Sequence, residues 1–272
     1  MQETLRGDQS DCCRGIRNYE SAATTWAYRL QRVFWRQRPT FDQTLHGTDT
    51  WRIRNNPLAW GSQDPDVVVL GFSKGPTQAG ALSRAPHDEI AFKGGRTALA
   101  KILHHIGLLA RPEAVLVDRL IADPAGQFHF GSLVRCTVER FDEKSCGWTG
   151  TGGGMLDRFV ADPFGSKIVS NCSRRFLSNL PARTRLVVML GLGNKGNYIA
   201  ACRQIFQRCR PGRWRTVNEV AYADDQVVVV HAEHFAAQGA LIPNWLSGRA
   251  HERGRLGLLA REAVDFALTR QR

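Results

Sequence analysis

The feature that most constrains this chain is a series of short apolar runs that alternate with helix-like segments beyond Pro65. Runs such as VVVLG, VVMLG and VVVVH predict buried strands. The predicted strands cover residues 66–71, 128–138, 186–190 and 226–231, and the predicted helices cover residues 97–109, 172–180, 197–207 and 256–268. Strands that alternate with helices form a parallel sheet with helices on both faces. The sequence therefore predicts an α/β protein, a three-layer αβα sandwich around a parallel sheet of about four strands.

Ligands of such sheets gather beyond the carboxyl ends of the strands. In this chain those ends carry Gly71-Phe72-Ser73, Arg135-Cys136, Gly191 and His231. We therefore expect the functional site to be built from these residues.

Residues 1–60 are basic and aromatic and lack the alternating apolar runs, so they are predicted to form a helical basic extension, whereas residues 61–272 are predicted to form the αβα domain. One helix is expected over residues 21–37, because apolar side chains there recur at helical spacing and Pro39 ends the pattern. The glycine-rich segment 148–154 is predicted to be a loop.

The chain carries 37 Lys and Arg against 25 Asp and Glu, a formal net charge of +12. Such an excess favours binding to polyanions, with nucleic acid before an anionic membrane surface, although a charge that serves solubility alone stays an alternative. The N-terminal residues lack the apolar core of a signal peptide, and no apolar run is long enough to span a membrane, so a cytoplasmic protein is expected. Seven cysteines without a regular framework fit a reducing compartment.

A dinucleotide site is suggested by Gly191-x-Gly193-x-x-Gly196, which follows a predicted strand and precedes a predicted helix. The acidic residue that normally follows at the end of the next strand is replaced by His231. A tight turn between a strand and a helix needs glycine without any ligand, and this interpretation is favoured.

A serine hydrolase is suggested by Gly71-x-Ser73-x-Gly75, which has the form of a nucleophile elbow. Asp224 or Asp225 and then His231 follow in the chain order of that fold. Residues 76–86 hold two prolines and no apolar stripe, which does not suit the helix beneath an elbow. The hydrolase stays an alternative.

Taken together, the four strand ends resemble the motifs of the uracil-DNA glycosylase superfamily. The matching stretches are VVVLGFSKG with IAFKGGRTALAKIL, then SLVRC, then VVMLG and finally VVVVHAEH, in order over about residues 64–268. Ser73 stands where the most active classes carry Asp or Asn, and Ala232-Glu233 stands where the family often has Pro-Ser. The resemblance implies excision of uracil or a related deaminated base from DNA by hydrolysis of the N-glycosidic bond. A catalytically weak DNA-binding relative with the same fold stays a second alternative.

The resemblance also implies a role for individual residues. His231 would donate a hydrogen bond to the departing base, where a preorganised donor stabilises the developing negative charge. Phe92 would stack on a flipped-out base, Ser132 would read its edge, and Ser73 would orient water beside the backbone of Gly71 and Phe72. The residues expected to grip DNA phosphates are Lys74, Arg96, Arg249 and Arg253.

Cys136 and Cys172 match two ligands of the iron–sulfur cluster found in one class of the family. A cluster needs four ligands, and the N-terminal cysteines Cys12 and Cys13 are adjacent instead of forming Cys-x-x-Cys. No cofactor is therefore expected, with an iron–sulfur cluster as the alternative.

Overall fold

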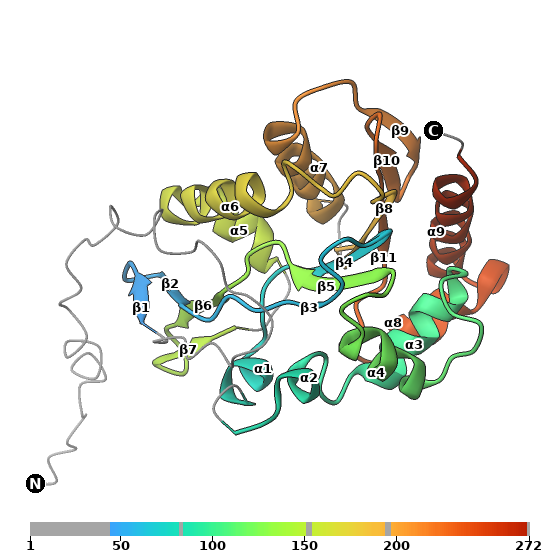
Figure 1. Cartoon of the computed structure of the whole chain (residues 1–272). Coiled ribbons are helices and arrows are strands. Elements are labelled where there is room, and N and C mark those ends of the chain that lie inside the picture. Colours follow the sequence, from blue (N-terminus) through green and yellow to red (C-terminus); the bar gives the residue numbers. More distant parts are fainter. Residues whose placement is uncertain (1–43, 82–83, 151–153, 194–196, 271–272) are drawn as a thin grey trace, which may run out of the picture.

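The structure is a computed structural model that describes residues 44–81, 84–150, 154–193 and 197–270 (Figure 1). The helix expected over residues 21–37 lies outside this part of the chain. The described residues form an α/β fold with one seven-stranded sheet, one four-stranded sheet and helices on both faces of the larger sheet.

The larger sheet has four neighbouring parallel strands, as the sequence predicts. They lie in the order β5 (Phe128–Ser132), β4 (Val67–Gly71), β8 (Leu186–Leu190) and β11 (Val228–Ala232), which is second, first, third and fourth along the chain. Three further strands pair antiparallel at the two edges and raise the number to seven: β3 (Trp60–Gly61), β10 (Ala221–Ala223) and β9 (Arg215–Asn218). The sequence analysis missed these strands because two to four residues are too few for a periodic pattern.

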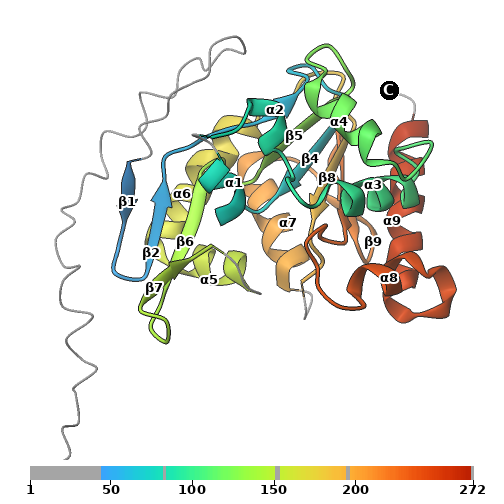
Figure 2. The ribbon, with the colours of Figure 1, turned by 90° about the horizontal axis from the view of Figure 1, so that it is seen from below.

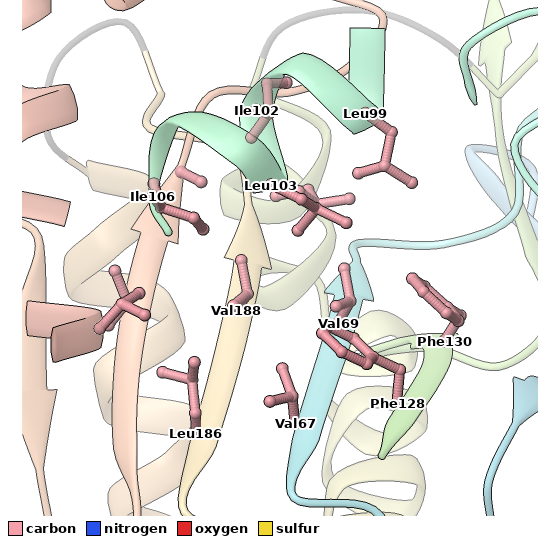
Figure 3. Packing of buried hydrophobic residues seen from close by; sticks show 14 of the residues in the cluster. Val67, Val69, Leu99, Ile102, Leu103, Ile106, Phe128, Phe130, Leu186 and Val188 are labelled. Atoms are coloured by element: carbon pink, nitrogen blue, oxygen red, sulfur yellow. The ribbon is translucent and has the colours of Figure 1, made fainter. Parts of the chain in front are cut away.

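Both faces of the parallel strands are buried, which explains why the strand sequences are apolar without alternation. Val67 and Val69 of β4 face α3 (Arg96–His105), α4 (Ala114–Ala122), α8 (Leu241–Leu246) and α9 (Glu252–Thr269). Val68 and Leu70 face α5 (Met155–Ala161), α6 (Pro163–Phe176) and α7 (Asn197–Cys209). Figure 2 shows the two groups of helices on opposite sides of the sheet. Figure 3 shows part of the first interface, in which Leu99, Ile102 and Leu103 of α3 and the following residue Ile106 lie above Val67, Val69, Leu186 and Val188.

A second, antiparallel sheet lies beside the first and has the order β1 (Leu45–Gly47), β2 (Trp51–Arg54), β6 (Thr137–Asp142) and β7 (Gly147–Thr149). The predicted strand 128–138 is in fact two strands, because β5 ends at Ser132 and β6 begins at Thr137 in the other sheet. The buried Asn56 fixes this start, since its amide donates to Thr137 Oγ1 at 2.9 Å and its oxygen accepts the Thr137 N–H at 2.8 Å.

The second sheet includes part of the segment 1–60, which was predicted to be a helical extension. The described part of that segment begins at residue 44 and contains strands instead of a helix, and its strand β2 pairs with β6. Residues 44–60 are therefore joined to the rest of the described domain by a β-ladder.

The four predicted helices are present, with shifted ends. The largest shift is at α6, which begins at Pro163 instead of residue 172 because Asp162 caps it by accepting the N–H of Phe164 at 2.9 Å. Helices α4, α5 and α8 were not predicted, and the remaining short helices are α1 (Pro76–Ala81), α2 (His87–Ile90) and the 3₁₀ turn Gly248–Ala250. Across the described ranges, no helix has both the length and the apolar character needed to cross a membrane.

Candidate functional site

The carboxyl ends of β4, β5, β8 and β11 lie along one edge of the sheet, as expected for parallel strands. Gly71 is opposite Ser132 in the ladder, and its carbonyl accepts the N–H of Leu133 at 2.9 Å. Where β8 and β11 end, the N–H of Gly191 donates to the Ala232 carbonyl at 2.8 Å. The structure therefore brings Gly71, Gly191 and the end of β11 to one edge, whereas the predicted end Arg135-Cys136 lies beyond β5, which ends at Ser132.

His231 does not have the role predicted for it. Its side chain is completely buried within β11. The ring nitrogen Nδ1 lies 3.1 Å from the Gly191 carbonyl, so it carries the proton and donates it there, and Nε2, at 3.3 Å from the Tyr222 hydroxyl, is an acceptor. Burial lowers the pKa of His231 to about 4, against the opposing effect of the Gly191 carbonyl. His231 is a neutral structural residue that holds the Gly191 turn, and its only N–H has no capacity left for a base.

His234, three residues later, lies beyond the end of β11 and is only partly buried. Its Nδ1 accepts the backbone N–H of Ala236 at 3.1 Å, which leaves the proton of the neutral ring on Nε2. Burial lowers the pKa of His234, and the nearby Glu233 carboxylate opposes this. A neutral imidazole with its Nε2–H as donor is therefore the form expected near pH 7. The sequence signal was the second histidine of VVVVHAEH.

Glu233 fixes the backbone that carries His234. It is 2% exposed, its Oε1 accepts the His234 N–H at 2.9 Å, and its Oε2 accepts from Arg253 Nε at 2.5 Å. A buried carboxylate that is fully hydrogen-bonded in this way is a rigid anchor. Arg253 was predicted to grip DNA, but its guanidinium instead ties α9 to this turn.

An aromatic contact joins the segment after β11 to the start of α3. The ring of Phe235 lies 5.1 Å from that of Phe92, edge to face, and 4.5 Å from that of His234. Phe235 also covers Gly95, where a Cβ would lie only 2.2 Å from its ring. Phe92 has a φ of 51°, which is rare for a bulky residue. These contacts connect two segments about 140 residues apart in the sequence.

Phe92 itself is not an open stacking surface. It is 5% exposed, and Phe130 contacts it at 5.7 Å in addition to Phe235. The predicted role as the floor beneath a base is therefore wrong for this arrangement of the rings. Phe235 is the half-buried aromatic residue at the edge.

The remaining predicted pocket residues keep their places at the edge. A Cβ on Gly71 would meet no atom within 4 Å, so a group has room to approach the backbone there. Ser73 is half-buried in the turn after β4, and Ser132 is buried at the end of β5. Phe72 turns its ring toward Phe159 of α5, at 5.9 Å. Of these residues, Gly71 has space beside its backbone and Ser73 is half-buried in the turn that follows.

Two further basic residues predicted to bind DNA are also engaged within the protein. Lys74 is buried and its Nζ donates to the Arg135 carbonyl. Arg96 donates to the Ala91 carbonyl at 2.9 Å and to Asp118 at 2.6 Å. Of the four predicted DNA contacts only Arg249 is exposed, while Lys93, next to Phe92, is an exposed cation that the sequence analysis did not select.

The serine hydrolase triad is not assembled. Asp224 pairs with Arg210 at 2.8 Å and caps the turn at Gln226, and both nitrogens of His231 are bonded to groups other than Ser73. The arrangement of these three described residues does not support a nucleophilic Ser73.

The glycines of the dinucleotide-like motif have a packing explanation. Gly191 and Gly193 have φ values of 136° and 70°, and a Cβ at either position would lie 3.0 Å or less from the side chain of Tyr198. The turn needs glycine because the chain turns sharply against α7. A bound nucleotide is not required to explain it.

The iron–sulfur cluster does not fit the described residues. They supply Cys136 and Cys172 at this position, and burial raises the pKa of the Cys172 thiol, which disfavours the thiolate that a metal needs. Within the described ranges, no group of three or more His, Cys, Asp or Glu side chains could hold a metal ion. Cys12 and Cys13 lie outside these ranges.

Comparisons of the sequence with profiles of known protein families and with curated proteins found no match.

Proposed function

We propose that this protein is a DNA glycosylase that removes uracil or a related deaminated base at the carboxyl edge of the larger sheet. The proposal includes the glycosylase-like αβα fold, for which the strand order second, first, third, fourth is support. The net charge of +12 suits a polyanionic partner.

One observation carries the proposal. Phe235, after the last parallel strand, packs on Gly95 and Phe92, which follow the first parallel strand in the sequence. Gly71, at the end of β4, has space beside its backbone, because an added Cβ would meet no atom within 4 Å. In the proposed site, His234, the Phe235 ring and the Gly71 backbone act together. A donor, a stacking surface and space beside the backbone are the components that recognition of a flipped-out base requires.

In the proposed reaction, the oxygen of water forms a bond to C1′ of the sugar while the base departs as an anion with the electrons of the N-glycosidic bond. The water loses one proton to solvent, and the base anion takes up one proton from solvent. His234 Nε2–H donates to a base oxygen on which negative charge develops, and a preorganised donor of this kind contributes about 3 kcal/mol. Phe235 provides the aromatic surface, and Ser73 orients the water. Ser73 is a weaker water-activating group than a carboxylate, so slow turnover is expected.

A single-stranded oligonucleotide with one uracil tests the proposal. After incubation with the protein and treatment with alkali, we expect strand cleavage at the uracil position and none in the matching thymine oligonucleotide. An intact uracil strand contradicts the proposal. Salt-sensitive binding without cleavage would then indicate a catalytically inactive relative, and labelling of Ser73 by a fluorophosphonate would indicate a hydrolase.

A further inference from the structure

A second feature of the structure is a cluster of buried basic side chains behind the ends of β4 and β5. Lys74 is 2% exposed, and its Nζ donates to the carbonyl of Arg135. An ammonium group has three N–H donors. Among the described residues, the Arg135 carbonyl is the only group that accepts a hydrogen bond from Lys74. The remaining donors of Lys74 lack acceptors in this part of the chain.

Arg135 is also poorly compensated. It is 8% exposed and packs above the ring of Phe176 at 4.7 Å, over Gly131, whose missing side chain makes room for the guanidinium. One terminal nitrogen lies 3.0 Å from His129 Nε2. Its buried Nε has no hydrogen-bond partner among the described residues. A guanidinium cannot lose its charge in a protein, so a buried Arg with an orphan donor is costly.

His129 does not supply negative charge to this cluster. Its Nδ1 lies 2.8 Å from the Ser62 carbonyl and therefore carries the proton, which leaves Nε2 as the acceptor for Arg135. Burial lowers the pKa of His129 to about 3, with Arg135 as the second cause. The ring is neutral and contributes an acceptor only.

No carboxylate compensates the two cations within the described residues. The ionisable groups that act on Lys74 are Cys136, Arg135 and Cys172, and Cys172 is the one that acts on Arg135. The Cys172 thiol is held in its neutral form, because burial raises its pKa. Buried charges in proteins are normally paired, so the cluster has the charge and the donors of a site for an anion.

We propose that Lys74 and Arg135 form a buried binding site for a small oxyanion of the phosphate type. A phosphate supplies both the negative charge and the acceptor oxygens that the cluster lacks, and a guanidinium together with an ammonium group is the donor set that phosphate prefers. Inorganic phosphate fits better than a phosphate of the DNA backbone, because a polymer cannot reach side chains that are 2% and 8% exposed. The site is independent of the proposed glycosylase activity.

Thermal unfolding at constant ionic strength tests the site, with inorganic phosphate replacing chloride. For a specific site, phosphate at about 100 times its Kd should raise the Tm of the wild type by roughly 5–10 °C. The Lys74→Met and Arg135→Met variants should lose this rise, whereas Lys101→Met, which changes an exposed lysine of α3, should keep it. Equilibrium dialysis of the wild type with labelled phosphate should give one bound equivalent, and this measurement holds even where a variant fails to fold.

Three outcomes overturn the proposal. The first is a wild type whose Tm does not respond to phosphate and which retains no phosphate in dialysis. The second is an equal rise in all variants, which would be a general salt effect. The third is stabilisation only by a single-stranded oligonucleotide without terminal phosphates, which would place the cations on a path of the DNA backbone.

Discussion

Replacing Lys74 by Met should change how the stability of the protein depends on pH. Burial lowers the pKa of Lys74 from 10.5 to about 7, with the Cys136 thiol opposing and Arg135 adding to the effect. Between pH 7 and pH 10.5 the unfolded chain therefore binds a proton that the folded chain does not, and the free energy of unfolding rises with pH. The full difference between the two pKa values corresponds to about 5 kcal/mol.

Urea unfolding in phosphate-free buffer measures this effect. Between pH 7 and pH 9 the wild type should gain about 2 kcal/mol from Lys74, and Lys74→Met, which cannot titrate, should lose this gain. The variant should also be the more stable protein at pH 7, because it removes a buried cation. Lys101→Met is the control, since its lysine is exposed on α3 and should leave the pH dependence as in the wild type. Parallel pH profiles for Lys74→Met and the wild type would show that Lys74 does not titrate with a lowered pKa in the folded protein.

Three further predictions concern the edge of the sheet. His231→Ala should lower the free energy of unfolding by about 3 kcal/mol, because it leaves a cavity and unpairs Tyr222 and the Gly191 carbonyl. His234→Ala should lower it by less than about 1 kcal/mol. Equal losses in urea unfolding would contradict the assignment of the two histidines. Glu233→Gln should weaken the hydrogen bonds that hold the turn after β11, and should slow base release about 10-fold while DNA affinity stays unchanged. If fluorescence anisotropy shows a loss of DNA affinity and base release is unchanged, Glu233 has a different role. Gly95→Ala should displace the Phe235 ring and reduce the rate of base release. Gly80→Ala is the control, because its added Cβ meets no atom within 4 Å, and it should leave the rate unchanged. Identical rates of base release in the two variants would argue against a role for the aromatic contact.

The sequence was sufficient for the four parallel strands of the main sheet, although it missed the three short antiparallel strands at its edges. The strands β4, β8 and β11 are apolar on both faces, and this pattern is typical of a parallel sheet that is covered by helices on both sides. Because the carboxyl ends of such strands share an edge, Gly71 and Gly191 could be grouped without coordinates. The predicted second end, Arg135-Cys136, was wrong, because β5 ends at Ser132.

The choice between His231 and His234 depends on register, which local sequence does not determine. The ladder of β11 with β8 continues to Ala232, opposite Leu190, so His231 lies inside the sheet. The pairing with β8, in which His231 lies opposite Met189, decides this, and VVVVHAEH has no periodicity that would predict it.

The basic residues were misplaced for a different reason. Lys and Arg are seldom buried, so a surface position is the reasonable expectation for Lys74 and Arg253. Their burial follows from tertiary partners, the Arg135 carbonyl in one case and the Glu233 carboxylate in the other. Such partners are distant in the sequence and carry no local pattern.

The proposed function depends most on His234, which is proposed to polarise a departing base at the carboxyl edge of the sheet. Single-turnover release of uracil from a single-stranded oligonucleotide by the wild type, His234→Ala and the exposed control His104→Ala measures it directly. We expect release by the wild type and the control, with the rate of His234→Ala lower by about 100-fold or more. Release that is undetectable in the wild type, or equally fast without the His234 imidazole, would contradict it.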